Sequence, residues 1–169
     1  MRAADPDTLH RSRRLPSVDA TTRLAELLSE HVRRGDFIGL AGTLGVGKTT
    51  FARAFINAIA RRGGAPEEEV PSPTFTLVQS YELPGLIVSH FDLYRIERPD
   101  EIHELGLDDA IADGAVLIEW PERLESFLPS DRLELILSAG ANPDERIAEL
   151  IGYGEWAERL AGIPDNDRA

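Results

Sequence analysis

The feature that most constrains this chain is a short glycine-rich stretch, Gly42–Thr49, which reads Gly-Thr-Leu-Gly-Val-Gly-Lys-Thr. It fits the phosphate-binding loop (P-loop) pattern of a glycine, four residues and then Gly-Lys-Thr. Glycines allow a tight bend in which backbone amides point inward and form a positive concavity for phosphate oxygens. Lys48 is predicted to reach the outer phosphates, and the Thr49 hydroxyl to ligate Mg²⁺. The glycines expected to shape the loop are Gly42, Gly45 and Gly47.

The segments on either side of the loop have the order that this chemistry requires. Residues 36–41 form a short apolar run typical of a buried strand, and residues 50–62 carry apolar side chains at helical spacing. Gly63 and Gly64 end the predicted helix. Such a helix presents its N-terminal amides and positive dipole end to phosphate. An ordinary glycine-rich turn is the alternative, and this context disfavours it.

Length and composition favour one globular domain. The chain has 169 residues, 42% of them hydrophobic, and contains no cysteine, so a single core without disulfides is expected. The domain is predicted to span residues 15–162. Residues 1–14 are expected to be a disordered N-terminal extension, and residues 163–169 a frayed tail.

The charge balance limits the partners of the chain. Its net charge is −12, and an acidic surface repels the phosphate backbone, so tight binding of nucleic acid by the chain alone is not expected. The candidate basic patch, Arg2, Arg11, Arg13 and Arg14, lies in the segment predicted to be disordered. Without a membrane-length apolar run or a signal-like apolar stretch, a cytoplasmic protein is expected.

Strand and helix patterns cover most of the remaining chain. A first helix is predicted at residues 19–34 with Asp19 as its N-cap. Pro84-Gly85 joins two runs that are expected to pair as a hairpin, residues 74–83 and 86–94. Further helices are expected at residues 99–105, 107–112, 121–128 and 155–160, and further strands at residues 115–118, 133–138 and 146–151.

A phosphate-binding loop needs an acidic partner at the tip of a neighbouring strand, because Mg²⁺ prefers hard oxygen ligands. Two carboxylates follow apolar runs, Asp92 and Glu119. Glu119 follows the cleaner run and is predicted to ligate Mg²⁺, directly or through water. Asp92 is predicted to act behind the metal ligands or to orient a water. For each, capping a turn or pairing with an arginine is the alternative.

Other polar and aromatic residues are candidates with open alternatives. Thr74, in a loop fixed by Pro71 and Pro73, is expected either to sense the γ-phosphate or simply to begin a strand. His90 is interpreted as a packed or hydrogen-bonded strand residue rather than a base. Trp120 is interpreted as a core residue, with a role in the site as the alternative. Residues 15–18 are placed near the nucleotide base.

Together, four motifs resemble a known family. They are Gly42 to Thr50, Pro71 to Phe75, His90 to Arg95, and Ile118 to Glu122, in this order. The set is similar to TsaE (YjeE), the bacterial P-loop ATPase of tRNA threonylcarbamoyladenosine synthesis. The resemblance implies an α/β fold, a P-loop NTPase three-layer sandwich with a mixed, mostly parallel sheet plus antiparallel additions. It also implies slow, Mg²⁺-dependent ATP hydrolysis that remodels the TsaD–TsaB complex. That complex modifies tRNAs reading codons that begin with A, so contact with tRNA would be indirect.

The resemblance also implies roles for individual residues. By motif position Thr49 and Glu119 would ligate Mg²⁺, Asp92 and Trp120 would be further site residues, and the segment near Val18 would approach the adenine. The residues implied to hold the phosphates are Gly45, Val46, Gly47, Lys48, Thr49 and Thr50. One departure is Thr43, where the family usually carries an acid, which leaves a charge-dependent partner contact in doubt.

Three other functions compete with this reading. A small-molecule kinase would need an acceptor pocket and usually a mobile lid bearing arginine, and only Arg95 and Arg98 suggest one. A GTPase would carry Asn-Lys-x-Asp, which the sequence lacks, and Asp-x-x-Gly after the P-loop, which is absent from that part of the sequence. A scaffold that binds nucleotide without hydrolysing it is disfavoured by the intact loop and carboxylates.

Overall fold

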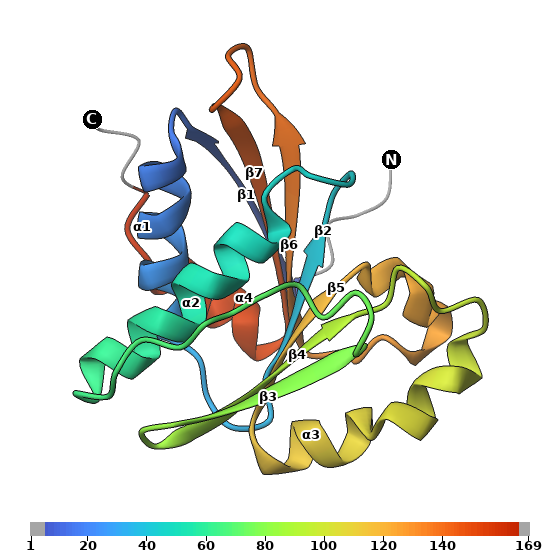
Figure 1. The fold of residues 1–169 in the computed structure, drawn as a ribbon. Coiled ribbons are helices and arrows are strands. Elements are labelled where there is room, and N and C mark those ends of the chain that lie inside the picture. The colour runs from blue at the N-terminus through green and yellow to red at the C-terminus, as the bar shows by residue number, and fades with distance from the viewer. Residues whose placement is uncertain (1–5, 166–169) are drawn as a thin grey trace.

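A seven-stranded mixed sheet runs through the centre of the protein (Figure 1). The structure is a computed structural model that describes residues 6–165. The strands are β1 (Thr8–Leu15), β2 (Phe37–Ala41), β3 (Val78–Leu83), β4 (Leu86–Asp92), β5 (Ala115–Glu119), β6 (Arg132–Ala139) and β7 (Arg146–Tyr153). The helices are α1 (Val18–Ser29), α2 (Lys48–Arg62), η1 (Pro99–Leu105), α3 (Leu107–Asp113), η2 (Pro121–Phe127) and α4 (Glu155–Gly162), where η denotes 3₁₀ turns.

The strand order is β1-β7-β6-β2-β5-β4-β3. The centre is parallel, since β2 pairs with β5 and β6, and β4 pairs with β5. Antiparallel pairing of β3 with β4 confirms the predicted hairpin, although β3 begins at Val78 rather than Thr74 and β4 ends at Asp92 rather than Tyr94. Strands β7 and β1 extend the other edge antiparallel. Within the described residues half of the strand pairings are parallel. The sheet therefore has a larger antiparallel share than the mostly parallel sheet that was expected.

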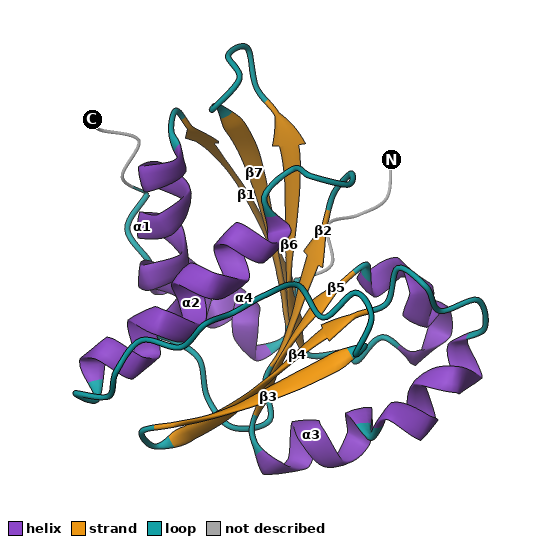
Figure 2. Cartoon of the chain, viewed as in Figure 1, coloured by secondary structure: helices purple, strands orange, loops and turns teal. Residues whose placement is uncertain are grey.

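Helices cover both faces of the sheet (Figure 2). Side chains alternate along the strands, so β2 directs Ile38 and Leu40 into the core under α1, α2 and α4, and directs Phe37 into a second core under η1, α3 and η2. β5 does the same with Leu117 and Val116. The near-continuous apolar sequence of these central strands therefore reflects burial on two sides.

Two predicted helix boundaries needed correction. α1 begins at Val18 rather than Asp19, because the Ser17 hydroxyl caps it by accepting a hydrogen bond from the Ala20 amide at 3.2 Å. It ends at Ser29, well before residue 34. α2 begins at Lys48, two residues earlier than its apolar pattern indicated, because its first turn is part of the glycine loop.

The prediction of a disordered extension over residues 1–14 is wrong for residues 8–14, which form most of edge strand β1; residues 1–5, Arg2 included, lie outside the described part. β1 pairs along its whole length with β7. Its arginines donate to carbonyls of the C-terminal segment, Arg11 to Ile163 and Arg13 to Pro164. The polar composition therefore reflects an edge strand whose charged side chains hold a neighbouring segment.

The tail that was predicted to be frayed, residues 163–169, begins with a buried residue. Ile163 is 2% exposed and belongs to the core beneath α1 and α4. The described chain continues to Asp165, whose carboxylate lies 3.9 Å from Arg13. Residues 166–169 lie outside the described part, so the prediction for them is not addressed.

Candidate functional site

The site lies where parallel strands β2, β4 and β5 end at one edge of the sheet. β2 leads into the glycine loop, and the last residues of β4 and β5, Asp92 and Glu119, are register partners. Alternation along the strands directs both carboxylates to the face that α2 covers. Because these strands are parallel, the glycine loop and the two strand ends that carry carboxylates lie at the same edge of the sheet.

The loop conformation depends on glycine. Gly42, Gly45 and Gly47 have φ values of 139°, 78° and 118°, which L side chains rarely adopt. A Cβ at Gly42 would also lie 2.5 Å from the Leu137 carbonyl oxygen. Gly47 is the N-cap of α2, so the loop amides and the positive end of a 15-residue helix face the same space. This combination suits an anion.

Lys48 is the single lysine of the chain and is 4% exposed. Its ammonium donates to the carbonyls of Gly42 and Thr43 and lies 3.6 Å from the centre of the Trp120 ring. Desolvation lowers the pKa of Lys48, against the opposing field of Glu119, Glu122 and Asp92. Among the described residues no carboxylate pairs with it, so its charge is available to an anionic ligand.

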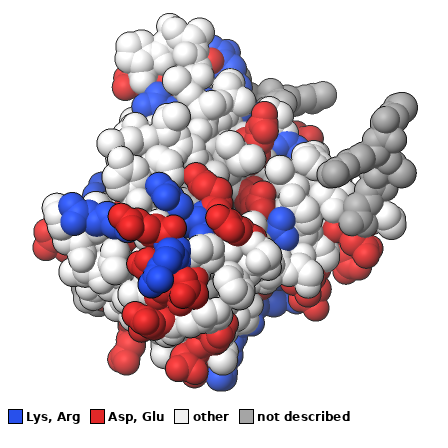
Figure 3. All heavy atoms as spheres, turned by 90° about the vertical axis from the view of Figure 1, so that its right-hand side faces the viewer, with Lys and Arg blue, Asp and Glu red and all other residues white. Residues whose placement is uncertain are grey.

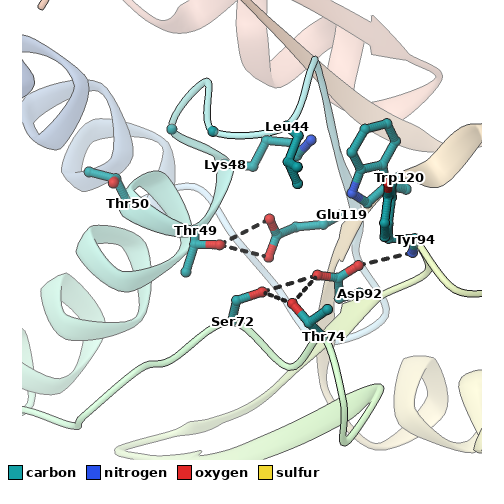
Figure 4. A pocket seen from close by; sticks show the side chains of 12 residues that line it. Leu44, Lys48, Thr49, Thr50, Ser72, Thr74, Asp92, Tyr94, Glu119 and Trp120 are labelled. Atoms are coloured by element: carbon teal, nitrogen blue, oxygen red, sulfur yellow. Dashed lines mark hydrogen bonds between the residues drawn. The ribbon is translucent and has the colours of Figure 1, made fainter.

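Glu119 is buried, with 3% of its surface exposed. The Thr49 hydroxyl lies 3.1 and 3.2 Å from its two carboxylate oxygens (Figure 4). His90 Nε2 lies 2.8 Å from Oε2. A buried carboxylate needs hydrogen-bond donors, and these two residues supply them. The arrangement brings together the two predicted metal ligands, Thr49 and Glu119.

Asp92, 4% exposed, is held by a different set of donors. Its Oδ2 accepts from the hydroxyls of Ser72 at 3.0 Å and Thr74 at 3.3 Å, and its Oδ1 accepts from the Tyr94 amide at 2.9 Å. Ser72 and Thr74 are themselves 2.9 Å apart. The loop before β3 is therefore tied to the end of β4, and no arginine in the described part of the chain pairs with Asp92.

These groups line an open pocket of about 300 Å³. Predicted residues on its wall are Gly45, Gly47, Lys48, Thr49, Thr50, Thr74, Asp92, Glu119 and Trp120. Thr50 points away from the two carboxylates (Figure 4). Trp120 has a left-handed φ of 63° and its ring lies 5.0 Å from that of Tyr94, so it lines the pocket besides packing against the core.

Three predicted residues do not line this pocket. Val46 is 5% exposed and packs in the core, while its carbonyl accepts from Arg146 at 2.6 Å. Gly42 contributes its carbonyl to Lys48. Val18 is 52% exposed at the start of α1. The placements of Val46 and Gly42 give them a role in shaping the loop.

Sequence reasoning missed three pocket residues: Leu44, Ser72 and Tyr94. Leu44 is 74% exposed at the tip of the loop, where the motif allows any residue. Ser72 lies between the two prolines that flagged Thr74, and Tyr94 lies two residues after Asp92. The proline-fixed loop and the residues just beyond the strand end were the available signals.

The oxygen donors present fit a magnesium ion whose other ligands are phosphate oxygens and waters. No group of three or more His, Cys, Asp or Glu side chains with the arrangement of a metal site occurs in residues 6–165. Mg²⁺ commonly uses one or two carboxylates together with substrate phosphates and waters. Thr49 and Glu119 supply hard oxygens beside the glycine loop, as that mode of binding requires.

Comparison with known proteins agrees with this geometry. Residues 15–148 match the family model described as threonylcarbamoyl adenosine biosynthesis protein TsaE. The chain belongs to the TsaE family. The TsaE protein of Rickettsia conorii is 36% identical over 137 residues, 81% of this chain and 75% of that protein. The Bacillus subtilis TsaE is 35% identical over 143 residues, 84% and 85% of the two chains. The resemblance stated from the four motifs is thus confirmed.

A solved structure extends the likeness to the fold. The crystal structure of Bacillus subtilis YdiB matches with a TM-score of 0.75 at 29% identity, over 92% of this chain and 93% of that one. Membership of the TsaE family carries a role in tRNA threonylcarbamoyladenosine biosynthesis. None of the described helices has the length and apolar composition needed to cross a bilayer.

Proposed function

We propose that this protein is a P-loop ATPase that binds ATP with Mg²⁺ and hydrolyses it slowly in support of tRNA threonylcarbamoyladenosine formation. The observation that carries the proposal is the convergence of the glycine loop, Lys48, Thr49 and Glu119 in one pocket. The loop amides and the N-terminus of α2 suit phosphate oxygens. This proposal includes the assignment of the fold to the P-loop NTPase sandwiches.

Thr49 and Glu119 would hold the metal, and bound Mg²⁺ would neutralise charge on the phosphate oxygens. Lys48 would exchange its contacts with the Gly42 and Thr43 carbonyls for phosphate oxygens, because an anion is the stronger acceptor. The positive φ values of Gly42, Gly45 and Gly47 would let the loop amides face the phosphates without steric cost. Phosphoryl transfer depends mainly on positioning and charge, which is what these residues provide.

Asp92 would orient the attacking water together with the hydroxyls that it already binds, Ser72 and Thr74. Phosphoryl transfer enzymes commonly position the nucleophile with one polar side chain. The two hydroxyls restrict the carboxylate on one side and leave it facing the pocket. Thr74 would sense the γ-phosphate from this position, and the segment near Val18 would approach the adenine.

The partners in this proposal are TsaD and TsaB, whose complex would modify tRNAs that read codons beginning with A. The chain itself would contact tRNA only through that complex. Its net charge of −12 supports this division. On the face shown in Figure 3, basic and acidic side chains are intermixed, with no continuous basic area that would suit a phosphate backbone.

Replacement of Lys48 by alanine tests the proposal. Because removal of a single charge-stabilising donor costs on the order of 100-fold or more in rate, Lys48→Ala should reduce phosphate release from ATP to that extent. The same variant should fail to support modification in a reaction reconstituted with TsaD, TsaB and tRNA. Arg61→Ala, at the exposed end of α2, is the control and should behave as wild type. Full turnover by Lys48→Ala would refute the proposal.

A further inference from the structure

We infer that His90 is a positioning residue that orients the Glu119 carboxylate for the metal; this inference rests on the proposed function. His90 lies on β4 and Glu119 on β5, and the shared face of the two parallel strands brings them together. The His90 Nε2 atom lies 2.8 Å from Glu119 Oε2, and the His90 side chain is 0% exposed. Solvent therefore cannot replace this contact.

The direction of the hydrogen bond follows from the two groups. An ionised carboxylate only accepts, so Nε2 must carry the hydrogen. The other ring nitrogen, Nδ1, is buried and has no hydrogen-bond partner among the described residues. The contact with Glu119 is consequently the one polar interaction that the His90 ring makes there, and it has no competing partner that would turn the ring away.

His90 and Asp92 share the same side of β4 because they are two residues apart. Asp92 binds the loop hydroxyls, whereas His90 reaches across to β5. The Thr49 hydroxyl is nearly equidistant from both Glu119 oxygens, so it does not select one of them. His90 does select one, because it binds Oε2 and leaves Oε1 without a second partner on this side of the pocket.

A buried hydrogen-bond donor of this kind can orient a metal ligand without itself contacting the metal. Hydrogen bonds behind metal ligands fix their orientation, and their loss typically costs about 10- to 100-fold in metal affinity. His90 is placed to do this for Glu119, because the half-buried Thr49 is the only other described residue that forms a hydrogen bond with that carboxylate. The expected effect is on metal affinity, with nucleotide binding in the absence of metal left intact.

The test compares four variants in the full-length protein. His90→Leu removes the donor and fills the space. His90→Gln keeps an N–H near the Nε2 position, and His90→Asn carries the same amide one methylene short. Ser89→Ala is the matched control, because it removes a part-buried hydrogen bond between Ser80 and the buried Ser89, at the neighbouring position on β4 and on the opposite face of the sheet.

Two readouts separate positioning from general damage. Mn²⁺ binding is measured by electron paramagnetic resonance in the presence of a non-hydrolysable ATP analogue, and binding of the analogue in EDTA is measured by calorimetry. We expect Mn²⁺ affinity about 10- to 100-fold weaker in His90→Leu and His90→Asn, largely restored in His90→Gln, and unchanged in Ser89→Ala. Binding in EDTA should be the same in all of them.

Three results would overturn the inference. Unchanged Mn²⁺ affinity in His90→Leu, or in His90→Asn if the leucine variant does not fold, would show that the hydrogen bond has no such role. An equal loss of binding in EDTA, or an equal loss in Ser89→Ala, would indicate damage to β4 as a whole. If wild type itself failed to bind the analogue with Mn²⁺, the proposed function would fall as well, and this outcome is distinct from the other two.

Discussion

Charged side chains are buried in two regions, the pocket and the contacts that hold α4 and the outer strands onto the sheet. Their hydrogen-bond partners differ between the two regions. In the pocket, Lys48 donates to backbone carbonyls, and Asp92 accepts from hydroxyls and an amide. Away from it, Asp36 and Arg159 form a two-bond ion pair, with both N–O distances at 2.7 Å.

Strand β2 joins these two environments. Asp36 precedes its first residue, and the glycine loop follows its last. At the first end a carboxylate is matched by a guanidinium, which also donates to the His31 carbonyl. At the other end no Arg or Lys of residues 6–165 forms an ion pair with the buried carboxylates, Asp92 and Glu119. The comparison indicates that charge paired within the protein serves stability, whereas unmatched charge beside a pocket remains available to a ligand.

The pKa shifts have opposite meanings in the two environments. Burial disfavours the charged form of Lys48 and so lowers its pKa. Hydrogen bonding between Arg14 and Glu145 raises the pKa of the arginine and lowers that of the glutamate, which favours both charged forms. A bound phosphate would stabilise the charged form of Lys48, as Glu145 already stabilises the charged form of Arg14.

Breaking the Asp36–Arg159 pair should have the largest effect on stability. Arg159→Met would leave Asp36 buried, with the Arg33 amide as its remaining donor, and loss of one partner of a buried pair costs about 3–5 kcal/mol. Urea unfolding measures this. The control is Arg61→Met, since the pair of Arg61 with Glu26 is largely exposed and should contribute about 1 kcal/mol or less. Similar losses in the two variants would contradict the comparison.

Removing the pocket carboxylates should affect ligand binding more than stability. Glu119→Ala is expected to weaken Mg²⁺-dependent ATP binding by about tenfold or more, and Asp92→Ala by less, because Glu119 contacts the predicted metal ligand Thr49. Neither carboxylate forms an ion pair with an Arg or Lys among the described residues, so the loss of unfolding free energy should be smaller than in Arg159→Met. Calorimetric titration at several Mg²⁺ concentrations measures binding. A larger defect in Asp92→Ala would exchange the two assignments.

The parts of the fold that were predictable depend on local pattern. The strand, loop and helix around residues 36–62 carry their own spacing signals, and the Pro84-Gly85 turn identified the β3–β4 hairpin. The convergence of Asp92 with Glu119 also followed from two strand ends in a parallel sheet. In each case the information lies within about 20 residues or in a general rule of sheet topology.

The parts that were not predictable depend on contacts between distant segments. The sequence of β1 is rich in arginine and resembles a disordered arm, but it becomes a strand because β7 and the C-terminal segment bind it. Nothing near Ser72 in the sequence indicates that it faces Asp92. The contact of His90 with Glu119 spans 29 residues, so the interpretation of His90 as a hydrogen-bonded strand residue omitted its partner.

The smallest expected effect concerns Arg14 and Glu145, because the Arg14 side chain is 64% exposed. Hydrogen bonds from Arg14, the Ala141 amide and Asn142 hold the pKa of Glu145 below its ordinary value. Since the unfolded chain binds this proton more readily, the pair stabilises the fold above the unfolded pKa, and that contribution is lost as pH falls through the folded pKa.

Arg14→Gln should therefore lower the melting temperature slightly at pH 7, and its difference from wild type should shrink as the pH falls from about 5 toward 3, through the range in which carboxylates titrate. Arg34→Gln is the control, because Arg34 donates to the Ala112 carbonyl, which does not titrate. Its difference from wild type should stay constant over the same range. A constant difference for Arg14→Gln as well would mean that the guanidinium acts through packing, and the contrast between paired and unmatched charge would then rest on Asp36 and Arg159 alone.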